Sequence, residues 1–91
     1  MSIKVVISME IKDFDVWNGI FSHEHSQNAR KEASIDVEAN QGLDNPNQVV
    51  LIGSAPSKES LMAFFSSPAQ QKRMQNAGVQ SKPAITFLKG E

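Results

Sequence analysis

Two histidines and their neighbours are the first candidates for chemistry. His23, Glu24, His25 and Asn28 lie in a stretch with the apolar spacing of a helix. Histidine titrates near neutral pH and a nearby polar group can orient it, so His25 is the candidate general acid or base. A helix turns by about 100° per residue, which places His23 on the solvent side and His25 at the border of the apolar face.

On the same helical wheel, Glu24 and Asn28 fall within the apolar face. A buried carboxylate without a partner is costly, so we expect Glu24 to be paired, bridged by water or directed into a cavity. The alternative is that the helix has reached the margin of the sheet by its fourth turn, where both side chains would be solvated. His23 and His25 do not share a helical face, so we expect no metal site there.

A second candidate feature is a set of aromatic side chains and a methionine that should meet over one side of a sheet. Core packing explains each of them singly, but rings and a flexible thioether together also suit an apolar pocket. The matching ligand is elongated and apolar with one polar end, such as an acyl chain, a quinone or a polyketide-like molecule. The predicted ligand contacts are Trp17, Phe21, Glu24, His25, Asn28, Phe64, Phe65 and Met74.

Four segments of the chain are predicted to be strands. Apolar residues alternate with polar ones over residues 3–11 and 35–40, which is typical of strands buried on one face. Residues 49–52 are continuously apolar, as expected of a strand covered on both faces. A last strand follows Pro83.

Two helices are predicted between these strands. The first runs from about Asp13 to Lys31, and the second starts after Ser57. The second is split at Ser66–Pro68, because a serine, a proline and a glutamine two residues later form a new helix start.

The order strand, helix, strand, strand, helix, strand predicts one α+β domain over residues 1–91, a ferredoxin-like βαββαβ sandwich. Right-handed crossovers place the first and third strands in the middle of a four-stranded antiparallel sheet. Helices then cover only one face. Val6 and one alternate set among residues 49–52 need another cover, so we expect a homodimer formed through the sheet face.

Composition excludes several classes of function. The 91 residues carry a formal net charge of −1 and no cysteine, which argues against a nucleic-acid or anionic-membrane surface and against thiolate chemistry, and fits a cytoplasmic location. The predicted central strands lack the aromatic residues that stack on RNA bases. The start of the chain lacks the apolar stretch of a secretory signal, and no run is long enough to span a membrane.

Four stretches of the sequence resemble the dimeric α+β barrel superfamily, particularly its antibiotic-biosynthesis-monooxygenase-like branch. These are residues 44–52, 57–61, 64–68 and 77–79. The resemblance implies two ferredoxin-like subunits packed sheet against sheet, each with a pocket between its sheet and its helices. Members include cofactor-independent monooxygenases, haem-degrading enzymes, lactone isomerases and proteins with no known activity, so the resemblance implies architecture more than chemistry.

The sequence departs from the monooxygenase-like pattern at two places. Phe64 stands where those members often carry a histidine, and Ser54-Ala55-Pro56 lacks their tryptophan near the end of the third strand. Our interpretation is therefore a homodimeric domain that binds a small apolar or amphipathic molecule without cofactor or metal. One alternative is a cofactor-independent monooxygenase or isomerase that uses His25, and another is a structural or stress-type dimer without a ligand.

Overall fold

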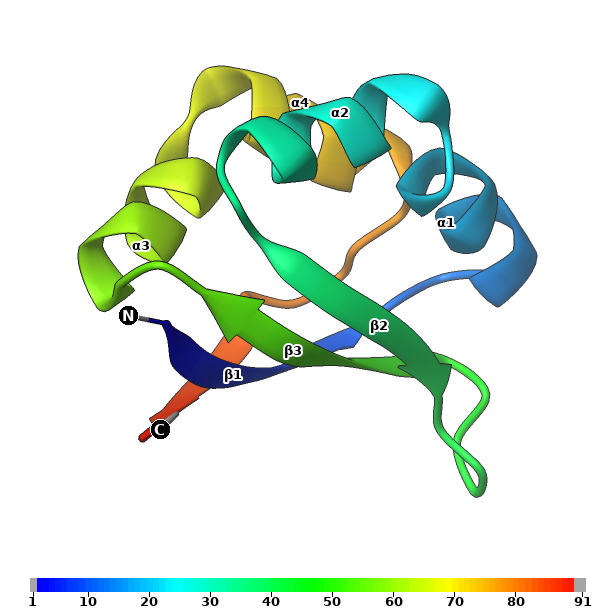
Figure 1. Ribbon diagram of the computed structural model, residues 1–91. Coiled ribbons are helices and arrows are strands. Elements are labelled where there is room, and N and C mark those ends of the chain that lie inside the picture. The colour runs from blue at the N-terminus through cyan, green and yellow to red at the C-terminus, as the bar shows by residue number, and fades with distance from the viewer. Residues whose placement is uncertain (1, 90–91) are drawn as a thin grey trace.

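Four antiparallel strands form one sheet, and four helices cover one of its faces, in the computed structural model, which describes residues 2–89 (Figure 1). The sheet order is β2-β3-β1-β4, which confirms the predicted ferredoxin-like sandwich with the first and third strands in the middle. In chain order the elements are β1 (Ile3–Glu10), α1 (Phe14–Phe21), α2 (Glu24–Glu32), β2 (Asp36–Gln41), β3 (Gln48–Ala55), α3 (Lys58–Ser66), α4 (Pro68–Asn76) and β4 (Ala84–Leu88).

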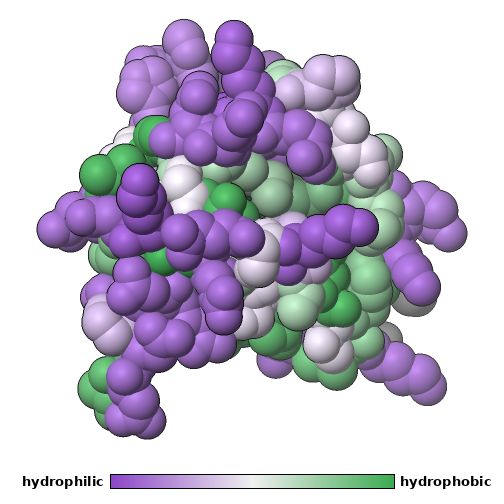
Figure 2. All heavy atoms as spheres, turned by 180° about the vertical axis from the view of Figure 1, so that it is seen from behind, coloured by the Kyte–Doolittle hydropathy of each residue, from purple (hydrophilic) through white to green (hydrophobic). Residues whose placement is uncertain are grey.

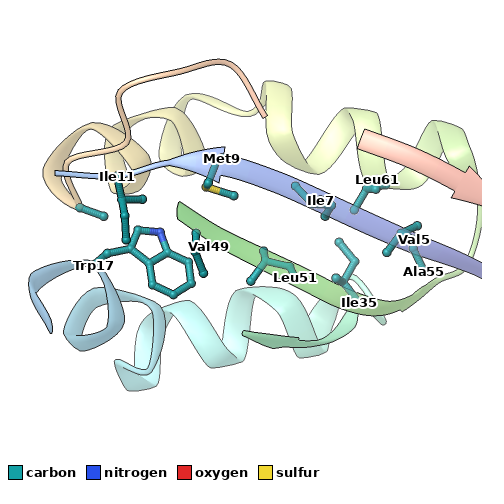
Figure 3. Packing of buried hydrophobic residues seen from close by; sticks show 11 residues of the cluster. Val5, Ile7, Met9, Ile11, Trp17, Ile35, Val49, Leu51, Ala55 and Leu61 are labelled. Atoms are coloured by element: carbon teal, nitrogen blue, oxygen red, sulfur yellow. The ribbon is translucent and has the colours of Figure 1, made fainter. Parts of the chain in front are cut away.

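The core lies between the sheet and the helices. Side chains alternate along β1 and β3, so one set from each strand points toward the helices and is buried, as Figure 3 shows. Trp17 from α1 and Leu61 from α3 complete the core from the helical side. The buried hydrophobic residues are Val5, Ile7, Met9, Ile11, Trp17, Ile35, Val49, Leu51, Ala55, Leu61 and Ala77.

The predicted first helix is wrong in one respect, because it is two helices rather than one. The break lies at Ser22 and His23. His23 has an extended backbone and serves as the N-cap of α2, its Nδ1 accepting a hydrogen bond of 3.2 Å from the backbone N–H of His25. Histidine is not among the common N-cap residues, so the sequence did not indicate a helix start here. Helical-face positions predicted by counting from Phe14 along one continuous helix are therefore not valid for residues of α2.

The predicted split of the second helical segment is confirmed. Ser67 ends α3 and begins α4: its Oγ donates a hydrogen bond of 2.9 Å to the carbonyl of Phe64 and accepts one of 3.2 Å from the N–H of Gln70. Pro68 occupies the first helical position, where its missing N–H costs nothing. One hydroxyl thus bonds to both the last turn of α3 and the first turn of α4.

The face of the molecule that is hidden in Figure 1 is not uniformly polar. Figure 2 views the molecule from behind and shows hydrophilic residues over the helices at the top, with hydrophobic residues gathered beneath them between protruding hydrophilic side chains. No helix within residues 2–89 has the length and apolar character needed to cross a membrane.

Ser67→Ala removes both hydrogen bonds of the hydroxyl. We expect the free energy of unfolding to fall by about 1–2 kcal/mol, measured by urea denaturation. Ser66→Ala changes the exposed neighbour in the same way and should shift stability by less than about 0.5 kcal/mol. Equal losses in the two variants would contradict the capping role.

Candidate functional site

A cavity of about 50 Å³ lies between the sheet and the helices. Its floor is formed by inward-facing residues of the central strands, among them Ile7, Met9 and Leu51. Residues from all four helices form its walls. The predicted ligand contacts that line it are Trp17, Phe21, Phe64, Phe65 and Met74.

The aromatic wall is built from interacting rings. Trp17 stacks on Phe21 with 4.7 Å between ring centroids, and the ring of Phe14 is tilted against that of Trp17 with 5.9 Å between centroids. Phe64 and Phe65 meet edge to face at 5.8 Å on the opposite wall. Stacked and T-shaped ring pairs of this kind are favourable beyond the burial of their apolar surface, so the aromatic wall is stabilised by its own contacts.

The other three predicted contacts lie outside the lining of the cavity. Glu24, His25 and Asn28 are all exposed. Because α2 begins anew at Glu24, a helical wheel counted from Phe14 does not apply to Glu24 and Asn28. Both side chains are solvated in the structure, which was the alternative left open by the sequence. Glu24 stands in the first turn of α2, where a negative charge suits the positive end of the helix.

His25 borders a shallow hollow next to the cavity. Its ring lies edge-on to that of His23 at 5.0 Å between centroids. The hollow shares three lining residues with the cavity, Ile20, Ser26 and Arg73, so the two spaces adjoin at that wall. The candidate acid or base is therefore placed near the edge of the cavity, not inside it.

Four polar residues at the cavity were missed by the sequence analysis: Ser26 and Arg30 from α2, and Gln70 and Arg73 from α4. Ser26 and Arg30 are four residues apart, and Gln70 and Arg73 are three apart. Such spacings place each pair on one helical face. The signal in the sequence was this spacing, which can direct both polar side chains of a pair toward the sheet.

Arg30 is held tightly at the cavity wall. Its guanidinium lies over the ring of Phe21, with 3.8 Å from Cζ to the ring centroid, and its Nη2 donates a hydrogen bond of 2.9 Å to the carbonyl of Phe21. Burial, and then the positive charge of Arg73, lower the pKa of Arg30. Arginine nevertheless stays protonated in proteins, so two positive charges face one apolar space.

Arg73 is oriented by its own helix. Its Nε donates a hydrogen bond of 3.0 Å to Oε1 of Gln70, one turn earlier in α4. The described residues that line the cavity include Arg30 and Arg73 but no carboxylate. Within residues 2–89, no three His, Asp or Glu side chains are grouped so that they could hold a metal ion. The arrangement can therefore enclose an apolar group and attract a negative one.

Comparison with known proteins gives structural matches only. The sequence matches no protein-family model and no curated protein. Among solved structures, the fold is similar to SnoaB, a cofactor-independent oxygenase from Streptomyces nogalater, at 9% identity and a TM-score of 0.71 over 99% of this chain and 95% of that one. It is also similar to an antibiotic biosynthesis monooxygenase, at 13% identity and a TM-score of 0.65 over 100% and 99% of the two chains.

A third structural relative carries no known function. It is a NIPSNAP family protein from Agrobacterium tumefaciens, at 10% identity and a TM-score of 0.70 over 98% of this chain and 87% of that one. At these identities the likeness establishes the fold and not the activity. The predicted resemblance is confirmed at that level: this is a small protein with the ferredoxin-like fold of the antibiotic-biosynthesis-monooxygenase-like structures.

The contact between Phe21 and Arg30 is measurable. We expect the double-mutant cycle of Phe21→Leu and Arg30→Met to give a coupling of about 0.5–1 kcal/mol in the free energy of unfolding, because leucine keeps an apolar side chain but removes the ring face. The matched cycle of Phe14→Leu with Arg30→Met should give a coupling near zero, although Phe14 also lies against Trp17. Equal couplings would contradict a specific Arg30–Phe21 interaction.

Proposed function

We propose that this protein binds a small apolar or amphipathic molecule between its sheet and its helices. The observation that carries the proposal is the cavity beside Trp17, Phe21, Phe64, Phe65 and Met74. A void walled by stacked rings, a thioether and the inner face of a sheet loses packing contacts, and an apolar guest restores them. Binding is favoured over catalysis because the candidate acid or base, His25, lies outside the lining.

The binding site opens further when it is filled. Ligand pockets measure roughly 300–1,000 Å³, far more than the present cavity, so an acyl chain enters only if part of the wall moves. The helix α4 is suited to move: α1, α2 and α3 are anchored by the buried residues Trp17, Ser26 and Leu61, whereas α4 buries none of its own. Met74 on α4 is only partly buried and can rotate with it.

The proposal includes a homodimer through the uncovered face of the sheet. Val6 on β1 pairs with Ile52 on β3, and both side chains point away from the helices. Ile52 is 43% exposed in the central strand β3, and Leu88 is 44% exposed on β4. Apolar side chains in the middle of an open sheet face favour a partner surface, and a second copy offers a self-complementary one.

Ligand binding is tested with octan-1-ol, an apolar chain with a small neutral head. Its addition at tenfold excess over Kd should raise the melting temperature by roughly 5 °C. It should also change the fluorescence of Trp17, the one tryptophan of the chain. Ala77→Leu should abolish both effects, because it adds side-chain volume at the buried cavity wall.

Ala69→Leu is the matched control, since it makes the same change at an exposed position of α4. It should keep the response to octan-1-ol. If both leucine variants respond like the natural protein, the ligand binds elsewhere and the cavity is not the site. If the natural protein gives no response, the structural dimer without a ligand becomes the better description.

The dimer is tested by analytical ultracentrifugation at micromolar concentration. We expect twice the chain mass of 10.0 kDa. Ile52→Lys should give a monomer, because it places a charge in the apolar centre of the interface. Val16→Lys alters another exposed hydrophobic residue, on α1, and should leave the dimer intact. A monomeric natural protein, or a dimeric Ile52→Lys variant, contradicts the sheet-face dimer.

A further inference from the structure

The polar part of the cavity wall consists largely of two arginines from different helices. Arg30 comes from α2 and Arg73 from α4, and both side chains are partly buried. Each is fixed by a contact of its own: Arg30 by the ring and carbonyl of Phe21, Arg73 by the amide of Gln70. Positioned guanidinium groups on rigid elements are typical of sites that recognise anions.

The contacts that fix these arginines do not neutralise them. A backbone carbonyl and a side-chain amide accept their hydrogen bonds, and the described cavity lining contains no carboxylate. Burial, and then repulsion from Arg73, already act against the charge on Arg30 and lower its pKa. Two like charges that share a partly buried site repel one another, and an anion bound between them would relieve that repulsion.

The hydrogen-bonding capacity of the pair is also largely unused. A guanidinium has five N–H donors, and the hydrogen bonds to described residues come from Nη2 of Arg30 and Nε of Arg73. The remaining donors match the two oxygens of a planar carboxylate, which accepts them in a bidentate manner. A carboxylate is also small enough for a cavity of about 50 Å³.

We propose that the ligand is an apolar monocarboxylate whose carboxylate is held between Arg30 and Arg73. This inference rests on the proposed function, since the same cavity must first accept an apolar body. The head group sits at the wall shared with the neighbouring hollow, where Arg73 and Ser26 line both spaces. The apolar chain extends from there beneath Met74 and Phe65. The polar end of the ligand thus meets arginine, in place of Glu24, His25 or Asn28.

The test compares octanoate, octan-1-ol and octylamine, which share one chain and differ in the charge of the head. Titrations followed by Trp17 fluorescence should give octanoate an affinity at least about tenfold higher than octan-1-ol, with octylamine the weakest. Arg73→Gln should lower the octanoate affinity about tenfold and that of octan-1-ol by far less, because only the carboxylate forms a charged pair with Arg73. Lys72→Gln makes the same charge change at an exposed neighbour and should alter neither affinity.

The outcomes separate the inference from the function on which it rests. If octan-1-ol binds and octanoate binds no better, the arginine site is refuted and the apolar pocket stands. If neither binds, the proposed function fails. If octyl phosphate binds as tightly as octanoate and with the same dependence on Arg73, the choice of a carboxylate is overturned.

A second variant tests the role of Arg73 in case Arg73→Gln does not fold. Gln70→Glu keeps Arg73 in place and sets a carboxylate beside it, where it competes with the ligand as an internal anion. It should weaken octanoate binding about tenfold and octan-1-ol binding by far less, because the neutral head is not repelled by a carboxylate. Unchanged octanoate binding in a folded Gln70→Glu variant refutes the role of Arg73.

Discussion

One side of a four-stranded sheet has to be covered by four helices of only eight or nine residues each, and the rest of the structure depends on that constraint. A helix this short has two turns and can direct few side chains inward. Trp17, Ser26 and Leu61 are the buried residues that α1, α2 and α3 contribute, and α4 contributes none. Coverage by so few anchors is incomplete, and a cavity lined by residues of all four helices remains above the sheet.

The two breaks that shorten the helices also determine which of their polar residues face the sheet. His23 starts α2 afresh, so that Ser26 and Arg30 face the sheet while Glu24 and Asn28 face water. Ser67 likewise starts α4 as a new helix, and Gln70, Arg73 and Met74 of that helix line the cavity above the sheet. As a result, two arginines from different helices lie at the wall of one largely apolar space.

Several parts of this structure were predictable because they follow from short-range rules. The central position of β3 follows from the continuous apolar residues 49–52, and the split at Ser67 follows from its capping hydroxyl and the proline after it. The aromatic wall was also predictable, since Phe64 and Phe65 are adjacent large apolar residues on a helix that had to cover the sheet. In each case the deciding atoms lie within a few residues of one another.

What the sequence by itself determined is therefore the order of the elements, the strands at the centre and the aromatic residues that face them, because periodicity and capping act locally along the chain. Only the tertiary structure decided the chemistry of the site. A histidine acting as an N-cap turned α2 away from the path of α1. Glu24, His25 and Asn28 therefore lie outside the cavity lining, and Arg30 lies near Arg73, which is 43 positions further along the chain. Such a meeting depends on the angles between packed helices, and no pattern within one helix specifies those angles.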